Sequence, residues 1–288
     1  MSNSISFANL RRRLAPMIRP ILEHFPPIRF VAVWLLTLKQ SDKLQRCGLE
    51  FVLPSGDFGV TLEAESTGEY EPVTTVLVQE LLKEGMTFID IGAHVGLFAL
   101  PATLSVGSLG RVIAFEPHPE NFAMLQVNIQ NNPLPCEIEA VESAVSDCSE
   151  PVHLFMSTFN SGDHQLFHKG GRNTIEVQCT TLDDYVKEGT KIDVIKIDVQ
   201  GAEAAAFRGM QRVLKENQEI KVIWELSPAQ LNDAGSSADE LLHWLSALDF
   251  SFTIVDDASG DVTKASLDEV LELCPNNSYL NILCGRNE

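Results

Sequence analysis

The sequence predicts an α/β protein with a mostly parallel sheet and helices on both of its faces. Short apolar runs, typical of buried strands, alternate with helical segments over residues 86–248. Several of these runs end in an acidic residue that is followed at once by a turn. The carboxyl ends of parallel strands meet at one edge of a sheet, where ligands bind, so we expect these acids to lie close together.

The central motif covers residues 86–96, Met-Thr-Phe-Ile-Asp-Ile-Gly-Ala-His-Val-Gly. Its first six residues predict a buried strand, and a helical pattern begins after the last glycine. Glycine tolerates positive φ and lets the backbone approach a ligand, and a helix N-terminus offers free N–H groups. The residues expected at a cofactor are Asp90, Gly92, Ala93, His94 and Gly96.

The spacing of the glycines indicates which cofactor is bound. A dinucleotide needs Gly-x-Gly-x-x-Gly to hold its pyrophosphate. Here His94 occupies the second glycine position, and Gly96 comes one residue before the third. An acid next to Gly-x-x-x-Gly suits instead a cofactor without phosphate that has a positively charged amino-acid tail. S-adenosylmethionine (SAM) meets that description.

A second acid supports a nucleoside cofactor. Residues 111–115, Arg-Val-Ile-Ala-Phe, predict the next strand, and Glu116 and Pro117 follow it before a helix at 120–131. In nucleotide-binding α/β folds an acid at the end of the second strand accepts hydrogen bonds from ribose hydroxyls. Glu116 comes 26 residues after Asp90, so Glu116 and the adjoining Pro117 are candidates for cofactor binding.

Three motifs in this order resemble the FkbM-type SAM-dependent methyltransferases: Phe-Ile-Asp-Ile-Gly-Ala-His-Val-Gly (88–96), Phe-Glu-Pro-His-Pro (115–119) and Ile-Lys-Ile-Asp-Val-Gln-Gly-Ala-Glu (195–203). The resemblance covers roughly residues 48–286 and implies the class I, Rossmann-like methyltransferase fold with seven strands. It also implies methylation of a hydroxyl on a sugar, polyketide or similar natural product. Two residues depart from the family pattern: Gln200 stands where Glu is usual, and His94 where Asn is frequent.

Composition limits the partners and divides the chain. Of the 288 residues, 44% are hydrophobic and 21% charged, and the net charge of −19 argues against a nucleic-acid partner. Residues 1–43 hold seven basic and two acidic residues, so they carry +5 and the remainder −24. We therefore expect a basic helical N-terminal arm over 1–47 and a methyltransferase domain over 48–288. A small β-hairpin and a lead-in helix (48–84) would precede its core (85–288).

Two interpretations of the N-terminal arm, about residues 1–45, stay open. A basic amphipathic arm can make a peripheral membrane contact, or its apolar face can pack on the domain or on a second subunit in a homo-oligomer, which we favour. The apolar run at 30–38 is far shorter than the ~20 residues that cross a bilayer. Six cysteines without paired spacing indicate reduced thiols, so we expect a cytoplasmic protein, with the inner membrane face as the peripheral alternative.

Segments around the first strand predict further structure. Strands at 49–53 and 58–64 are expected to form the hairpin, and a helix at 73–83 follows Glu71. Glu71 resembles the family's segment that lies over the cofactor, although an ordinary helix start is an equal alternative. Pro101 predicts a kink or a late start for the helix after the glycine turn, because proline lacks an N–H.

The third strand, 137–145, is expected to border the adenine, so Ser143 and Asp147 are candidates for contacting the base. Strands at 152–156 and 174–181 enclose a long polar loop that contains His164. Long loops in compact domains are often functional, and a histidine titrates near neutrality. A polar turn and a hydrogen-bonded loop histidine are the alternatives.

The fourth strand, 192–197, ends in Asp198, a helix over about 201–215 follows, and the fifth strand, 220–226, contains Glu225. A hydroxyl acceptor has to lose its proton during methyl transfer, which requires a base or a metal. Asp198 is the first candidate for orienting the acceptor or taking its proton, and it is also expected beside the sulfonium. Glu225 and His164 are second candidates. Alternatively, Asp198 and Glu225 share a divalent cation such as Mg²⁺, whereas no Cys/His arrangement suggests zinc.

Three functions stay open. The first is a SAM-dependent methyltransferase that acts on a small molecule or glycan. The second is a dinucleotide-dependent oxidoreductase, for which the sequence offers neither a tight glycine triplet nor a positioned Tyr/Lys pair. The third is a cofactor-binding module without catalysis.

Overall fold

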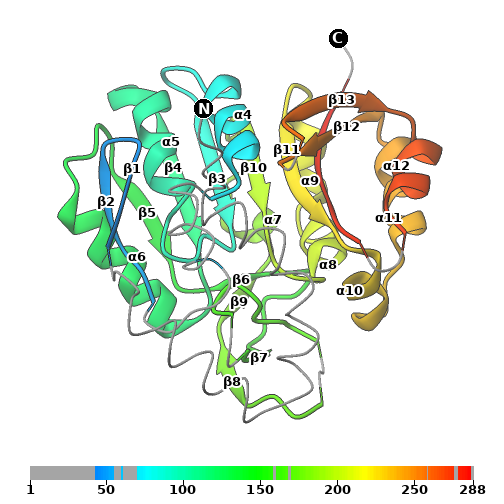
Figure 1. The fold of residues 1–288 in the computed structure, drawn as a ribbon, viewed down its shortest axis with the longest axis horizontal. Helices are drawn as coiled ribbons and strands as arrows, with labels where there is room; N and C mark the ends of the chain where they lie inside the picture. Colours follow the sequence, from blue (N-terminus) through cyan, green and yellow to red (C-terminus); the bar gives the residue numbers. More distant parts are fainter. Residues whose placement is uncertain are drawn as a thin grey trace, which may run out of the picture.

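The computed structural model of the chain describes residues 43–54, 60, 70–157, 160–167, 170–257, 259–275 and 278–286. Its centre is an eight-stranded sheet in the order β13-β12-β14-β11-β10-β3-β4-β5 (Figure 1). Five neighbouring strands are parallel: β3 (Thr87–Ile91), β4 (Arg111–Phe115), β5 (Ile138–Val141), β10 (Val194–Ile197) and β11 (Lys221–Leu226). Three antiparallel pairings extend the sheet beyond β11, through β14 (Leu280–Arg286), β12 (Phe250–Asp256) and β13 (Asp261–Ala265).

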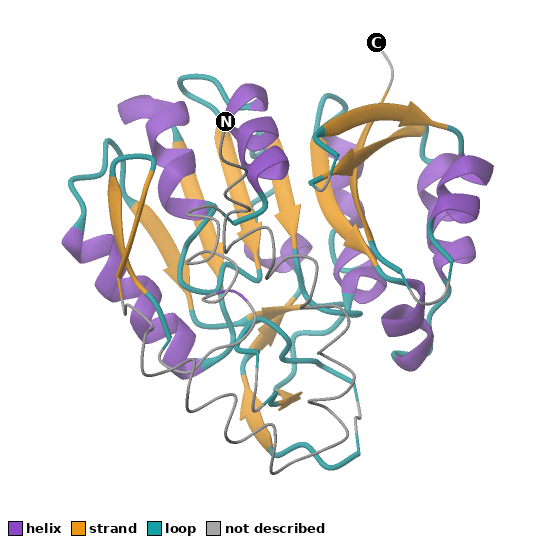
Figure 2. Ribbon diagram, viewed as in Figure 1, coloured by secondary structure: helices purple, strands orange, loops and turns teal. Residues whose placement is uncertain are grey.

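Helices cover both faces of the sheet, as the sequence predicts (Figure 2). One face packs against α4 (Pro72–Leu81), α5 (Ala99–Val106) and α6 (Pro119–Asn131), with a short 3₁₀ turn at Gly107–Leu109. The other packs against α7 (Leu182–Tyr185), α8 (Glu203–Arg208), α9 (Gln211–Glu216), α10 (Pro228–Asp233), α11 (Ala238–Ala247) and α12 (Leu267–Leu273). Because both faces are covered, the central strands are buried and read as apolar runs. The predicted α/β class is confirmed.

Several predicted elements lie within two residues of their predicted positions, namely β3, β4, β10, β11, α4 and α6. The helix after the glycine turn does start late: residues 94–98 form turns, and Pro101 is the third residue of α5. There its missing N–H removes no interior helix bond.

The sheet has eight strands where seven were expected. The additional strand, β13, pairs antiparallel with β12 at the edge of the sheet. Four of its five residues are exposed. An edge strand with one solvated face and no apolar alternation leaves little signal in a sequence.

The first strand of the predicted hairpin is present, whereas its predicted partner, 58–64, lies outside the described residues apart from Val60. β2 (Leu49–Val52) pairs with β1 (Lys43–Arg46), across a two-residue turn at Cys47 and Gly48. Both turn residues have positive φ, of 52° and 75°, which matches the twist of a tight hairpin. The boundary predicted at 47/48 therefore falls in this turn. Residues 1–42, and residues 58–64 apart from Val60, lie outside the described residues.

Two predicted elements are split in the structure. The third strand ends at Val141, and residues 144–145 (β6) leave the main sheet to pair with β9 (Cys179–Thr180). The helix predicted over 201–215 is divided between α8 and α9. It breaks at Gly209, where a Cβ atom would lie 1.9 Å from the Ser146 carbonyl oxygen. The predicted strands at 152–156 and 174–181 form a separate hairpin, β7 (Val152–Phe155) with β8 (Thr174–Val177).

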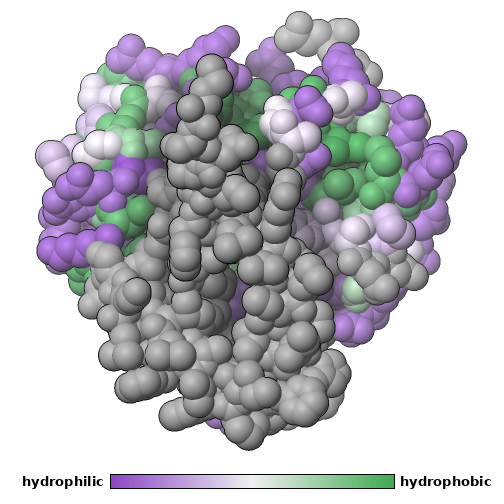
Figure 3. Space-filling view, in the orientation of Figure 1, coloured by the Kyte–Doolittle hydropathy of each residue, from purple (hydrophilic) through white to green (hydrophobic). Residues whose placement is uncertain are grey.

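Hydrophilic side chains surround the visible face of the molecule, and apolar ones show mainly over the antiparallel strands (Figure 3). All six cysteines are free thiols. Within the described part of the chain, no helix has the length and apolar composition needed to cross a membrane.

Candidate active site

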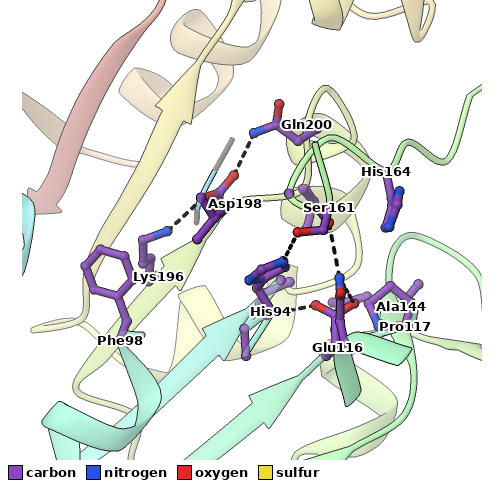
Figure 4. Close-up of a pocket in the computed structure, with 18 of the residues that line it drawn as sticks. His94, Phe98, Glu116, Pro117, Ala144, Ser161, His164, Lys196, Asp198 and Gln200 are labelled. Carbon is purple, nitrogen blue, oxygen red and sulfur yellow. Dashed lines mark hydrogen bonds and ion pairs between the residues drawn. The ribbon is translucent and has the colours of Figure 1, made fainter. Parts of the chain in front are cut away.

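A cavity that is partly open to solvent lies at the carboxyl ends of β3, β4 and β10 (Figure 4). This edge of a parallel sheet is where ligands bind in α/β folds. The lining comes from the turn after β3, the start of the turn after β4, the end of β10 and the segment 161–166. These parts of the chain lie far apart in sequence but meet at one edge of the sheet.

The turn after β3 brings the three strand ends together. The N–H groups of Gly92 and Ala93 both donate to the Phe115 carbonyl oxygen at 2.9 Å, which ties the turn to β4. Gly92 has a φ of 83°, and a Cβ atom there would lie 2.0 Å from the Asp198 carbonyl oxygen. Only glycine therefore fits between the ends of β3 and β10. Gly96 does not line the cavity; a Cβ atom there would meet side chains of α5 and α6, so Gly96 serves their packing.

Glu116 lines the cavity and is held by N–H donors. Its Oε2 accepts from the His94 backbone at 2.8 Å, and its Oε1 accepts from the His118 backbone at 2.9 Å and from the Asn121 amide at 3.5 Å. Burial raises the pKa of Glu116 to about 7, although these donors lower it. No cation forms an ion pair with it among the described residues. Glu116 can therefore accept hydrogen bonds from hydroxyls without competition from a salt bridge.

Asp198 stands at the end of β10 and is held from two sides. Its Oδ2 lies 3.1 Å from the Nζ of Lys196, and its Oδ1 accepts from the Gln200 amide at 2.8 Å. Burial alone would raise the pKa of Asp198, but the Lys196 ammonium and the Gln200 amide together lower it below its usual value. Lys196 also lies 4.3 Å from the centre of the Phe98 ring. Asp198 is therefore an ionised carboxylate that faces the cavity.

Three further carboxylates surround Lys196 without lining the cavity. Asp90 is fully buried beside Lys196 in the β3–β10 pairing, and burial raises its pKa to about 6. Burial, followed by repulsion from Asp198 and Glu71, raises the pKa of Glu225 well above its usual value. Burial alone would lower the pKa of Lys196, but Asp198, Glu71 and Asp90 raise it. With several acids around one lysine, this end of the cavity favours a cationic group.

The segment 160–167 is tied to the turn after β3. The Nε2 atom of His94 lies 2.7 Å from the Ser161 hydroxyl, and the Asn121 amide donates to the Ser161 carbonyl oxygen at 3.1 Å. His94 has a φ of 52°. The side chain that stands where Asn is frequent in the family thus connects two walls of the cavity.

His164 lies on the side of Pro117 and Ala144, away from Asp198 (Figure 4). Its Nδ1 accepts a hydrogen bond from the Ser157 N–H at 3.1 Å. Burial, and then the neighbouring His118, lower the pKa of His164 to about 3. A neutral imidazole whose Nδ1 accepts carries its proton on Nε2. No lone pair then remains on His164 to take a proton from a substrate.

Of the residues predicted to contact the nucleoside, Ser143 and Pro117 line the cavity, whereas Asp147 lies outside it. The Asp147 carboxylate pairs instead with the Nε of Arg208 at 2.7 Å. The reason is the early end of the third strand, because β6 carries the following residues away from the sheet edge. Glu71, Asp90, Gly96 and Glu225 are the other predicted site residues that do not line it.

The donor set at Asp198 does not fit a divalent cation. One carboxylate oxygen faces an ammonium and the other accepts from an amide, so neither is directed at a shared metal. In the described ranges, no group of three or more His, Cys, Asp or Glu side chains could hold a metal ion. We therefore derive no step through Mg²⁺.

The sequence reasoning missed Lys196, Phe98 and Asn121, all of which line the cavity. Lys196 carried a signal, because a lysine inside an apolar strand is rarely buried unless it is paired. Phe98 and Asn121 lie on turns and helices whose pattern is accounted for by packing alone.

The parallel sheet with a β14–β12 antiparallel extension, helices on both faces and a cavity at the strand ends define the class I, Rossmann-like methyltransferase fold. The family model described as "Methyltransferase FkbM domain" matches residues 90–252, more than half of the chain. The chain therefore belongs to the FkbM methyltransferase family. The matched residues are a methyltransferase domain of that family. Because the family is one of methyltransferases, the dinucleotide-dependent oxidoreductase is no longer a candidate function.

Individual proteins resemble the chain more distantly. It is 25% identical to hexuronic acid methyltransferase AglP of Haloferax volcanii over 150 residues, which are 50% of this chain and 58% of AglP. The chain thus spans a little over half the length of that relative. A putative rRNA methylase of Clostridium thermocellum has 10% identity, with 74% of this chain and 95% of that one covered and a TM-score of 0.47. A SAM-dependent O-methyltransferase of Thermotoga maritima has 14% identity, with 86% and 78% covered and a TM-score of 0.42.

Proposed function

We propose that the protein transfers a methyl group from SAM to a hydroxyl oxygen of a sugar or a related small natural product. The observation that carries the proposal is the ionised Asp198 carboxylate, which faces the cavity between Lys196 and Gln200. A carboxylate can orient a neutral hydroxyl and take its proton. The relative AglP, whose name specifies hexuronic acid, supports a sugar acceptor.

The lining residues fit SAM better than a cofactor with phosphates. Lys196 is the one lysine or arginine that lines the cavity within the described residues, and it is already paired with Asp198. A pyrophosphate would therefore find no available cation there. The acid-rich end suits the positively charged tail and the sulfonium, and Glu116 at the other end suits the ribose hydroxyls.

We assign the cofactor to the turn after β3 and the end of β4, through residues that line the cavity: Gly92, Ala93, His94, Glu116, Pro117, Ser143 and Asp198. Asp90 and Glu71 do not line the cavity, and they favour binding of the positively charged cofactor through their charge. When bound, SAM supplies an electrophilic methyl group on a positively charged sulfur. Glu116 accepts hydrogen bonds from hydroxyls and fixes the nucleoside, so that the reacting end is aligned with the acceptor.

Asp198 acts on the acceptor. Its carboxylate accepts a hydrogen bond from the attacking hydroxyl, which orients the oxygen, and takes the proton as the new C–O bond forms. Glu225 is not suited to that role, because it does not line the cavity. Because all six cysteines are free thiols, we also propose a reducing, cytoplasmic compartment.

The test uses the full chain, SAM with an isotopically labelled methyl group and a panel of neutral sugars, hexuronic acids and other hydroxylated compounds. The expected product is a methyl ether on a sugar hydroxyl, heavier by one methylene. Label that appears on an ester, an amine or a nucleic acid would contradict hydroxyl methylation. SAM binding by calorimetry without transfer to any compound would support the non-catalytic module instead.

A further inference from the structure

Gln200 forms the middle of a directed chain of amides that ends on Asp198. Its Nε2 donates to Asp198 at 2.8 Å, and its Oε1 accepts from the Nε2 of Gln230 at 2.9 Å. An ionised carboxylate can only accept, so the Gln200 nitrogen has to face Asp198 and its oxygen has to face Gln230. The charge on Asp198 thereby sets the orientation of both amides.

The backbone turn after β10 keeps Gln200 in this position. Gln200 has a φ of 50°, a left-handed conformation that is uncommon for residues other than glycine. Gly201 follows with a φ of 100°, and a Cβ atom there would lie 2.6 Å from the Phe167 ring and 2.9 Å from the Gln230 carbonyl oxygen. α10 therefore packs tightly on the turn, and the Gln200 side chain is directed back onto the residue two positions earlier.

We propose that Gln200 is a positioning residue for methyl transfer: with Gln230 behind it, Gln200 fixes the Asp198 carboxylate toward the acceptor oxygen. Lys196 holds the other carboxylate oxygen at 3.1 Å, so Asp198 is held from two sides and cannot rotate freely. This role rests on the proposed function, which assigns Asp198 to the acceptor hydroxyl.

The amide at this position acts on Asp198 differently from the glutamate that is usual in the family. A glutamate there would place two carboxylates within hydrogen-bonding distance, and like charges so close together compete for one proton. The neutral amide donates to Asp198 and leaves it ionised. Other titratable groups also act on Asp198, and they are Lys196 on its own strand, Asp90 on β3, His94 in the turn after β3, Glu203 on α8 and Glu225 on β11.

The first test measures the Asp198 carboxyl group directly, in the full chain without any ligand. Aspartate is labelled with ¹³C at Cγ, and the Asp198 signal is assigned by its loss in Asp198→Asn. In the wild type, the signal should titrate below the usual aspartate pKa. Gln200→Leu should raise that pKa by about one unit and Gln200→Glu by more, because the first removes a donor and the second adds a charge.

Two further variants separate positioning from folding. Gln230→Leu changes a residue outside the cavity lining and should shift the Asp198 titration in the same direction by a smaller amount. Gln178→Glu makes the same chemical change at an exposed position and should leave the titration as in the wild type. An unchanged titration in folded Gln200→Leu and Gln200→Glu would overturn the proposal.

The second test follows methyl transfer and SAM binding in the same variants. Gln200→Leu should lower kcat at least about tenfold and move the pH–rate profile upward, while the calorimetric Kd for SAM stays within about threefold. A loss confined to SAM affinity would contradict positioning of Asp198. Absence of transfer in the wild type, with the expected titrations, would overturn the proposed function alone. Unchanged titrations with normal transfer would overturn the role of Gln200 alone.

Discussion

Glu116 and Asp198 are carboxylates at the ends of two buried parallel strands, yet their pKa values shift in opposite directions. Glu116 accepts three hydrogen bonds from neutral N–H groups, and burial still raises its pKa to about 7. Burial also opposes ionisation of Asp198, but the Lys196 ammonium and the Gln200 amide lower its pKa. Of these two carboxylates, the one in contact with a cation is the one whose pKa is lowered.

The difference divides the cavity into two functional ends. The Glu116 end has neutral histidines and amides, which suit uncharged hydroxyl and base groups. The Asp198 end has several acids around one lysine, which suits a cationic group and a proton to be accepted. Four substitutions test this division of the cavity, in decreasing order of predicted effect.

Asp198→Asn should have the largest effect on turnover. The amide keeps the shape of the side chain but cannot take a proton, so kcat should fall by about 10²–10⁴. SAM affinity, measured by calorimetry, should change far less. Asp147→Asn is the control, because Asp147 is an acid with an ion pair outside the cavity. Full activity in Asp198→Asn would mean that another group takes the proton of the acceptor hydroxyl.

Gly92→Ala should disrupt the turn that joins the two ends. Its Cβ atom would lie 2.0 Å from the Asp198 carbonyl oxygen, so the turn has to move, at a cost of about 3 kcal/mol in the free energy of unfolding. Gly171→Ala is the matched control, with a similar φ of 81° and no atom within 4 Å of its Cβ position. Its effect should be about 1 kcal/mol, from backbone strain alone. Equal effects in urea unfolding would contradict the close approach.

Glu203→Gln tests the effect of burial without a cation. Burial raises the pKa of Glu203 to about 7, from 4.5. Between these values the native state keeps the proton that the unfolded state has lost, so stability falls as pH rises from 4.5 to 7. Glutamine keeps the acceptor for the Gly201 N–H and does not titrate. Its free energy of unfolding should exceed that of the wild type by about 2 kcal/mol at pH 7.5 and by little at pH 4.5.

A difference that does not grow with pH would mean that Glu203 is not the titrating group. Asp90 and Glu116 add slopes of the same sign, so the variant should keep a shallower pH dependence rather than lose it.

Glu116→Gln should show the smallest effect, on the pH dependence of SAM binding. Ribose hydroxyls donate to the ionised carboxylate, whose pKa is about 7 before binding. Wild-type affinity should therefore rise by about tenfold from pH 6 to pH 8, with release of a proton. The variant should bind more weakly and without that rise, in calorimetry run in buffers of different ionisation enthalpy. If SAM binding to the wild type released no proton, the ribose hydroxyls would not be bound by Glu116.

The residues alone were sufficient to predict the α/β class, the strand ends that carry Asp90, Glu116 and Asp198, and a glycine spacing unsuited to pyrophosphate. These features are local, because apolar runs and glycine turns show within a few residues of chain. The acids at the strand ends also come close together, because the carboxyl ends of parallel strands lie at one edge of the sheet.

Tertiary structure decided which of these acids lines the cavity and which stays ionised. Asp147 was predicted to contact the adenine. Because β6 leaves the sheet, Asp147 lies outside the cavity and forms an ion pair with Arg208. His164 was a candidate base until burial among other histidines and a hydrogen bond from Ser157 left it without a free lone pair. The position of Asp147 and the protonation of His164 depend on contacts and electrostatic interactions with groups that are distant in sequence. No local pattern of residues predicts them.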